Sequence, residues 1–129
     1  MNILDEQITG DQRVQLRSLR VSVRHIGYDI GHKGLQDDEI IPLLHHLRRP
    51  TFFTRDWDFY ERYLCHPRYC IVYLGVERNE VAFFVRRLLR HPEFDTEAKR
   101  MGTVVRVLHS ELSYWRLYEE REVRVSWPT

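Results

Sequence analysis

Two kinds of apolar pattern alternate along the chain. Nearly continuous runs of β-branched and aromatic residues, typical of buried strands, lie at 51–54, 69–76 and 103–108. Between them, apolar residues recur at helical spacing at 40–47 and 81–88. Alternation of this kind favours a largely parallel sheet with helices on both faces. The pattern therefore predicts an α/β fold.

Weaker signals complete the expected order of elements. Further strands are expected at 2–4 and 21–26, and an edge strand runs through the alternating Val123, Val125 and Trp127. Shorter helices are expected at 11–20, 58–64 and 96–101. The predicted order is β-α-β-α-β-α-β-α-β, followed by one or two β segments. We expect a single domain spanning residues 1–129.

Capping residues indicate where two of these helices begin. Thr9, followed three residues later by Gln12, suggests a capping box for the first helix. The next helix should begin within 37–39, because Pro42 is tolerated only near a first turn. Asp37, Asp38 and Glu39 fall at this start, where acids satisfy free N–H groups and suit the helix dipole. That structural role accounts for at least one of the three acids.

Composition narrows the class of protein. A chain of 129 residues with 43% hydrophobic and 12% aromatic residues is typical of one globular domain rather than of a disordered chain. Its 20 basic and 19 acidic residues give a net charge of +1, which does not by itself favour a nucleic-acid partner. No apolar run is long enough to cross a bilayer and no signal peptide opens the chain. We expect a soluble, cytoplasmic protein without a membrane partner.

The cysteines and histidines do not form a recognisable catalytic or zinc motif. Cys65 and Cys70 are interpreted as ordinary thiols, because no second Cys/His pair stands at zinc-finger spacing. The seven histidines show neither HxxxH nor HExxH spacing, and none stands beside a marked nucleophile. A hydrolase of the Ser/His type is therefore disfavoured.

Acidic residues follow two of the predicted strands. The strand at 51–54 runs directly into Asp56 and Asp58, and the strand at 2–4 is followed by Asp5. The carboxyl ends of parallel strands meet at one edge of a sheet, so these acids and an acid from 37–39 can converge. Crowded carboxylates repel each other unless a cation neutralises them, and oxygen ligands favour Mg²⁺ or Mn²⁺. The alternative is that these residues are helix caps and surface acids.

Three segments resemble the PIN-like domains, a family that includes the VapC-type toxin nucleases. They are Ile3-Leu4-Asp5-Glu6, the stretch Gly34-Leu35-Gln36-Asp37-Asp38-Glu39-Ile40-Ile41, and Phe53-Thr54-Arg55-Asp56-Trp57-Asp58-Phe59. The resemblance covers roughly residues 1 to 110. It implies a three-layer α/β/α sandwich with a mainly parallel central sheet, and a Mg²⁺- or Mn²⁺-dependent endoribonuclease. It also implies RNA as substrate and, for the toxin of a toxin–antitoxin pair, an antitoxin protein as partner.

The same resemblance implies roles for individual acids. Asp5 is similar to the first acid of the family, Asp56 to the acid after the third strand, and Asp58 to its neighbour. Asp37 fits the register of the helix acid best, with Asp38 and Glu39 as alternatives. Asp5, Asp37, Asp56 and Asp58 are therefore the expected catalytic and metal-binding residues. The chain departs from the family in its short first strand, its Gly-His-Lys-Gly loop and its tail after Leu108.

Basic and aromatic residues are consistent with an RNA partner. The arginines that could form a phosphate-binding rim are Arg13, Arg17, Arg48, Arg49, Arg55, Arg86, Arg87 and Arg90. Trp57, Phe59 and Tyr60 could stack on an unpaired base. The alternatives are solvated helix faces for the arginines, a core position for Phe59 and packing at the sheet edge for Trp57.

A second hypothesis comes from a different functional class. The chain would be a catalytically silent PIN-like module that acts through dimerisation or partner binding. Its interface would use the apolar and aromatic residues of the tail, which are Leu112, Tyr114, Trp115, Leu117, Tyr118 and Trp127.

Overall fold

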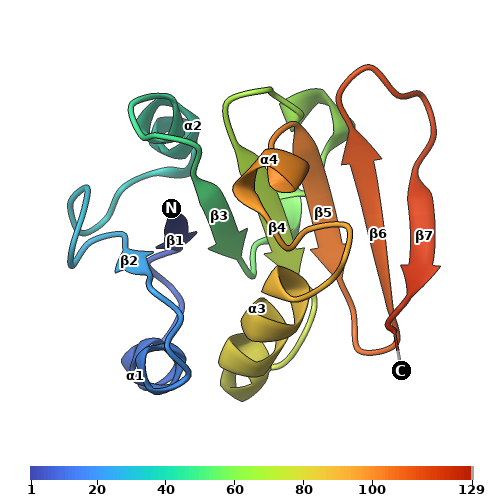
Figure 1. Ribbon diagram of the computed structural model, residues 1–129. Coiled ribbons are helices and arrows are strands. Elements are labelled where there is room, and N and C mark those ends of the chain that lie inside the picture. The colour runs from blue at the N-terminus through green and yellow to red at the C-terminus, as the bar shows by residue number, and fades with distance from the viewer. Residues whose placement is uncertain (129) are drawn as a thin grey trace.

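A mixed seven-stranded sheet forms the centre of the computed structural model, which describes residues 1–128 (Figure 1). Its strands are β1 (Asn2–Leu4), β2 (Arg24–His25), β3 (Thr51–Thr54), β4 (Cys70–Leu74), β5 (Thr103–Val107), β6 (Glu111–Arg116) and β7 (Val123–Ser126). The spatial order is β2-β1-β3-β4-β5-β6-β7. Neighbouring strands are parallel from β2 to β5, and β6 and β7 are antiparallel. The predicted α/β class and the mainly parallel sheet are confirmed.

The helices are close to their predicted positions. They are α1 (Gly10–Ser18), α2 (Asp37–His45), α3 (Val81–Leu89) and α4 (Glu97–Arg100). The helix predicted at 58–64 is wrong, because the chain there forms two separate 3₁₀ turns, η1 (Trp57–Phe59) and η2 (Arg62–Leu64). A third 3₁₀ turn, η3 (Arg78–Glu80), leads into α3. Among the described residues, no helix combines the length and the apolar character that a membrane crossing requires.

Adjacent residues of a strand pack into two different hydrophobic cores, one on each face of the sheet. Phe53 and Val72 face the core that includes Leu16 of α1 and the inner side of α3. Phe52, on the opposite face, packs with Ile40 and Leu44 of α2 and with Phe59 of η1. The period of two along a strand produces this division, and the continuous apolar runs in the sequence reflect it. Helices therefore cover both faces of the sheet.

The connections between parallel strands do not share one hand. The connection from β1 to β2, which contains α1, runs towards the β2 edge of the sheet. The other three run towards the β7 edge: α2 connects β2 to β3, η1 and η2 connect β3 to β4, and α3 lies between β4 and β5. Helices α1 and α3 lie on the same face and contact each other, whereas α2 and η1 lie on the other face. The β4–β5 crossover is therefore opposite in hand to the other three, although such crossovers nearly always share one hand.

A topological switch point lies between β1 and β3. These strands are neighbours, but the chain leaves β1 for β2 at one edge and leaves β3 for β4 on the other side. In open α/β sheets, ligands bind at such a point, outside the carboxyl ends of the strands. Asp5 directly follows β1, and Asp56 stands two residues beyond β3. Both acids therefore belong to this edge of the sheet.

The tail forms part of the sheet. Strand β6 was missed as a separate prediction, and its Leu112 and Tyr114 are buried in the same core as Trp127. These three of the six residues proposed for the interface of the silent module pack instead against the chain's own sheet, and the interface itself stays a prediction. Of the other three, Trp115 and Leu117 are half-buried, and Tyr118 has 94% of its surface exposed.

Two local predictions in the N-terminal half are also wrong. The Thr9 side chain does not cap α1, and the Gln12 side chain turns inward, where its Oε1 accepts a hydrogen bond from the Ala82 backbone at 2.9 Å. The strand expected at 21–26 contains only Arg24 and His25, because Val21 and Val23 pack against the core from a loop.

Candidate metal centre

Thr54 connects two of the predicted acids. It is the last residue of β3 and is fully buried, and its hydroxyl donates to the Asp5 carboxylate at 2.6 Å. The same oxygen accepts the Asp56 backbone N–H at 3.0 Å. Asp5 is positioned as well by its own backbone N–H, which donates to the Phe53 carbonyl at 3.0 Å. One hydroxyl at the end of a central strand therefore positions residues that are 51 positions apart in the sequence.

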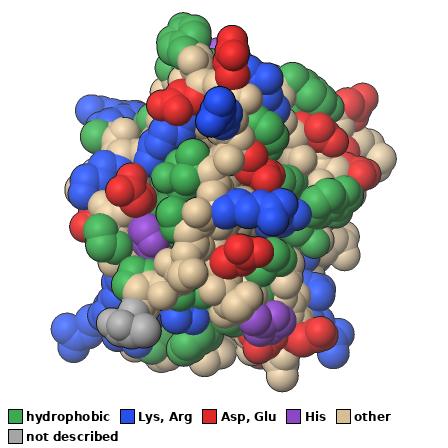
Figure 2. All heavy atoms as spheres, turned by 90° about the vertical axis from the view of Figure 1, so that its right-hand side faces the viewer, with side chains coloured by type: hydrophobic (Ala, Val, Ile, Leu, Met, Phe, Trp, Pro, Cys, Tyr) green, Lys and Arg blue, Asp and Glu red, His purple; other side chains and the backbone are tan. Residues whose placement is uncertain are grey.

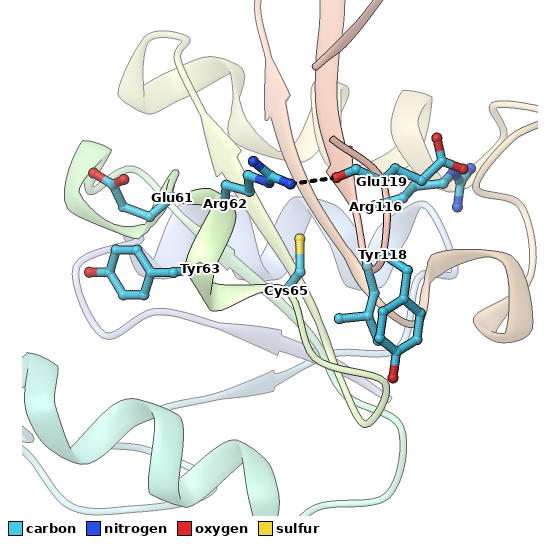
Figure 3. A pocket seen from close by; sticks show the side chains of 8 residues that line it. Glu61, Arg62, Tyr63, Cys65, Arg116, Tyr118 and Glu119 are labelled. Carbon is cyan, nitrogen blue, oxygen red and sulfur yellow. Dashed lines mark hydrogen bonds between the residues drawn. The ribbon is translucent and has the colours of Figure 1, made fainter. Parts of the chain in front are cut away.

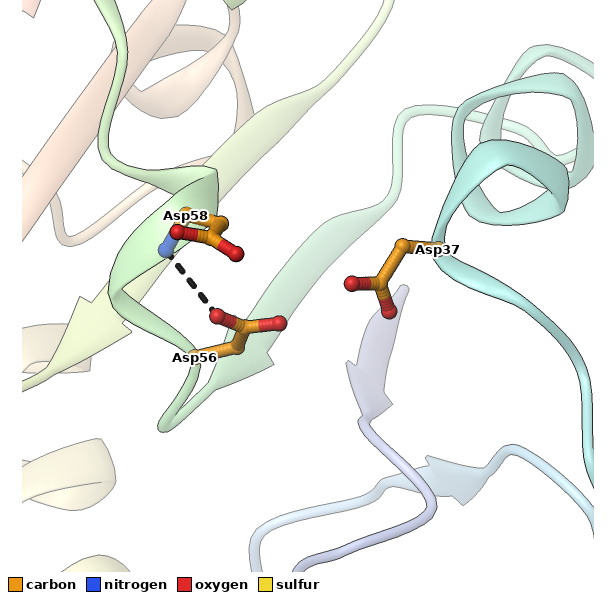
Figure 4. Close-up of side chains that lie close together, drawn as sticks. All are labelled: Asp37, Asp56 and Asp58. Carbon is orange, nitrogen blue, oxygen red and sulfur yellow. Dashed lines mark hydrogen bonds between the residues drawn. The ribbon is translucent and has the colours of Figure 1, made fainter.

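Asp56 and Asp58 share one turn. Asp56 is the N-cap of η1, and its carboxylate accepts the Asp58 backbone N–H at 3.0 Å. A short acidic side chain in this position closes a turn in place of a backbone carbonyl. This hydrogen bond uses one of the two carboxylate oxygens of Asp56. It also places the Asp58 carboxylate on the side of the turn where the Asp56 carboxylate lies (Figure 4).

Asp37 reaches this turn from another element. It is the first residue of α2, and its carboxylate points towards Asp56 and Asp58 (Figure 4). One oxygen from each of these three residues lies within 4.8 Å of the others. We refer to Asp37, Asp56 and Asp58 as the acidic cluster. Asp5 lines a cleft together with Asp37 and Asp56, but it does not belong to the acidic cluster.

The surroundings of Asp5 and Asp37 raise the pKa of both carboxyls. Burial is the largest cause that raises the pKa of Asp5, although the Thr54 hydroxyl works in the opposite direction. The pKa of Asp37, whose side chain is exposed overall, is also raised, first by partial desolvation of its carboxyl and then by the neighbouring Asp56 charge. Asp5 and Asp58 add smaller contributions of the same sign at Asp37. The carboxylates therefore repel each other in the absence of a cation.

The neighbouring acids of α2 have other positions. Glu39 accepts the Gln36 backbone N–H at 3.0 Å in a capping box, which is the structural role expected for one acid of this trio. Asp38 is exposed and lies outside the acidic cluster. Of the three alternatives, only Asp37 approaches Asp56 and Asp58.

The cleft contains residues that had no predicted role. It measures about 330 Å³ and is lined by Asp5, Glu6, Gln7, Leu35, Asp37, Arg55 and Asp56. Glu6 accepts the Gly34 backbone N–H at 2.9 Å and so holds the loop before α2 beside the cleft. Arg55 donates through Nε to the Val76 carbonyl at 3.1 Å, and within residues 1–128 it forms no ion pair with the acids. Two features of the sequence could have indicated these roles: Glu6 directly follows Asp5, and Thr54 directly precedes Arg55.

The predicted arginine rim is not continuous. Arg55 is the one arginine lining the acidic cleft in the described part of the chain. Arg13 instead pairs with Asp29 at 2.8 Å, and Arg86, Arg87 and Arg90 line a separate hollow along α3. On the face beside β7, basic, acidic and hydrophobic side chains are interspersed (Figure 2). Arg13, Arg86, Arg87 and Arg90 therefore do not form one basic surface with Arg55 at the cleft.

Another hollow, of about 450 Å³, lies where η2 meets the loop after β6. Arg62 donates there to the Glu119 carbonyl at 3.2 Å, and Glu61 and Tyr63 point away from Arg116 and Tyr118 (Figure 3). Charges of both signs surround it without converging. Cys65, which lines it, is a free thiol like Cys70, as predicted, and neither belongs to a metal-binding cluster of the described chain.

Comparison with known proteins adds no assignment. No family model matches the chain, and no curated protein or solved structure matches it. The RNA substrate, the antitoxin partner, the homodimer and the membership of the PIN-like family stay predictions.

Proposed function

We propose that the chain is a Mg²⁺- or Mn²⁺-dependent endoribonuclease of the PIN-like type. The observation that carries the proposal is the convergence of Asp37, Asp56 and Asp58 to within 4.8 Å at the topological switch point. A cluster of acids is common on protein surfaces. This one joins the end of a central strand to the start of a helix, from segments about twenty residues apart in the chain.

The donor set fits a hard divalent cation. All the groups are carboxylates, which Mg²⁺ and Mn²⁺ prefer. Oxygen atoms on opposite sides of an Mg²⁺ ion are roughly 4.2 Å apart, because each Mg–O bond is about 2.1 Å. The 4.8 Å limit of the cluster is close to that span, so small side-chain rotations, or a bridging water, suffice for binding. Asp37, Asp56 and Asp58 would hold the ion, with Asp5 at its side.

The protein's own residues would prepare the site for a phosphodiester. A divalent ion supplies an activated water and neutralises charge on the phosphate. Thr54 keeps Asp5 and Asp56 in place through its hydroxyl, and the Asp56–Asp58 turn holds two carboxylates in a fixed relation. Arg55 is positioned by the Val76 carbonyl at the edge of the same cleft, where its remaining N–H groups can contact a phosphate.

The finer fold assignment belongs to the same proposal. Helices on both faces of a mainly parallel sheet support a three-layer α/β/α sandwich of the PIN-like kind. Its carboxyl edge would carry the active site. The silent-module alternative has less support, because three of the six tail residues on which it depends, Leu112, Tyr114 and Trp127, are buried.

The test pairs metal binding with RNA cleavage. We expect purified protein to bind Mn²⁺ in calorimetry and to cleave single-stranded RNA with Mn²⁺ or Mg²⁺. The Asp56→Ala variant should lose at least roughly a hundredfold in cleavage rate, since it removes a direct ligand. Asp38→Ala is the matched control, because Asp38 lies on the same helix as Asp37 but outside the cluster.

Two outcomes would contradict the nuclease proposal. One is the absence of any Mn²⁺ binding or cleavage by the folded wild-type protein. The other is cleavage by Asp56→Ala at the rate of the Asp38→Ala control.

A further inference from the structure

A row of side chains leads away from the acidic cleft across the sheet. Register pairing places one residue of each neighbouring strand at the same level and on the same face. These are Thr54, Tyr73, Arg106, Ser113 and Arg124, from β3 to β7. Strands are about 4.8 Å apart, so the row extends roughly 19 Å from Thr54. It begins at the residue that holds Asp5 and ends at the edge strand.

Trp57 lies over this row and stands between Asp56 and Asp58 in the sequence. Its ring centroid is 5.3 Å from that of Tyr73 and 5.7 Å from that of Tyr60. Tyr60 is itself fixed by hydrogen bonds of its hydroxyl to Ser113 at 3.0 Å and to Glu122 at 2.6 Å. Trp57 nevertheless keeps 52% of its surface exposed. A large ring is thus held by its neighbours while much of it stays open to solvent.

Arg106 places a positive charge beside the same ring. Its guanidinium carbon lies 5.7 Å from the Trp57 centroid and 5.1 Å from the Tyr60 centroid. Its Nε donates to the Ser113 hydroxyl at 2.9 Å. Within residues 1–128 it has no carboxylate at ion-pair distance, and its terminal N–H groups have no hydrogen-bond acceptor. A planar guanidinium with free N–H groups suits a phosphate.

We propose that Trp57 and Arg106 bind one nucleotide of a single-stranded nucleic acid, with the base stacked on Trp57 and a phosphate on Arg106. That the adjoining phosphodiester then reaches the acidic cluster rests on the proposed nuclease function. Stacking requires an accessible base face, which an unpaired strand offers and the interior of a duplex does not. Because Trp57 is directly bonded to Asp56 and Asp58 in sequence, the stacked base defines which bond enters the cleft.

The binding experiment is done in EDTA, so that no divalent ion is present and no cleavage occurs. The probe is a short, fluorescently labelled single-stranded RNA of mixed sequence, titrated with protein. Trp57→Ala is expected to weaken binding by about tenfold, since loss of one stacked base has an effect of this size. Trp57→Phe, which keeps an aromatic face, should weaken it by less than about threefold.

Arg106→Gln tests the phosphate contact. It should weaken binding and lower the slope of log affinity against log salt by roughly 0.7, the value for one phosphate of a single strand. Tyr118→Ala and Arg62→Gln change an exposed aromatic residue and an arginine at the other hollow, and both should bind as the wild type does.

Tryptophan fluorescence separates stacking from a merely structural role. Unlabelled RNA should quench the wild-type emission, and this quenching should be largely absent in the folded Trp57→Phe variant, although that variant still binds. Unchanged wild-type emission on binding, equal affinity of Trp57→Ala and wild type, or equal affinity for a blunt RNA duplex would each overturn the proposal. A negative result for RNA stacking would not affect the measurement of Mn²⁺ binding at the acids. A negative result for Mn²⁺ binding would likewise not affect the RNA-binding measurement in EDTA, so the two proposals are tested separately.

Discussion

Asp37 faces two opposing electrostatic influences. As the first residue of α2 it lies near the positive end of the helix dipole, which favours its charge. Partial desolvation of the carboxyl and the charge of Asp56 act against that charge, and the pKa of Asp37 is raised. Carboxyls perturbed in this way cluster at functional sites, where a bound cation reverses the balance.

The residue-scale prediction compares Asp37→Asn with Asp38→Asn in metal-free protein. Both variants lose a charge at the start of α2, but only Asp37→Asn relieves repulsion within the cluster, so it should be the more stable of the two at neutral pH. The difference should be below about 1 kcal/mol, since exposed charges interact weakly. Urea denaturation in EDTA measures it.

The pH dependence follows from the raised pKa of Asp37. The folded state binds this proton more tightly than the unfolded state, so ionisation destabilises the fold at pH values above the folded pKa. As the pH falls through that pKa the penalty disappears, and the advantage of Asp37→Asn over Asp38→Asn should vanish with it. Added Mn²⁺ should stabilise Asp38→Asn more than Asp37→Asn. A lower stability of Asp37→Asn at neutral pH in EDTA would contradict this account.

At the scale of elements, helix α1 depends on a polar contact. Its buried side chains are Gln12 and Leu16, and Gln12 accepts the backbone N–H of Ala82 in the first turn of α3. That N–H has no partner within its own helix, because the first turn of a helix leaves its donors free. The contact joins the helix after β1 to the helix after β4, on the face of the sheet that both helices cover.

Gln12→Ala should therefore lower the free energy of unfolding by roughly 1–3 kcal/mol, because a buried N–H loses its acceptor. Gln15→Ala is the matched control, since Gln15 is exposed on the same helix and alanine favours helices. Chemical denaturation of both variants gives the comparison. Equal stability of the two would show that the Gln12 contact contributes nothing measurable.

At the scale of the whole molecule, the antiparallel strands complete the core begun by the parallel ones. Leu112 of β6 is fully buried and pairs in register with Val107 of β5. Trp127, after β7, donates through its indole N–H to the Leu108 carbonyl at 2.8 Å. The tail therefore belongs to the same folding unit as the acidic site.

Leu112→Ala is expected to lower the free energy of unfolding by roughly 2–5 kcal/mol through loss of buried contacts and the cavity left behind. Tyr118→Ala, in the same tail but almost fully exposed, should change it by less than about 0.5 kcal/mol. Thermal or urea unfolding distinguishes the two. If Leu112→Ala were as stable as the Tyr118 variant, the tail would be a separate appendage.

Local sequence patterns predicted most of the helices and strands, but they predicted fewer of the contacts between them. The apolar stripe of α2 and the runs of β3, β4 and β5 have a period that any buried helix or strand must show, so they were identifiable. The 3₁₀ turns at 57–64 were mistaken for a helix, because short helical turns carry similar apolar spacing. Gln12 was misassigned, because a capping box and a tertiary hydrogen bond use the same residue type.

The sequence by itself determined the alternation of strands and helices and the presence of acids just after two strands, whereas it left Phe59 open between a core position and a stacking role. The alternation of elements and the positions of the acids depend on residues a few positions apart, so a local sequence pattern is enough to predict them. Only the tertiary structure decided that Asp37, rather than Asp38 or Glu39, meets Asp56 and Asp58, and that Trp57 lies beside Arg106. Helix phase and strand order set those distances, and both result from packing between segments far apart in the chain.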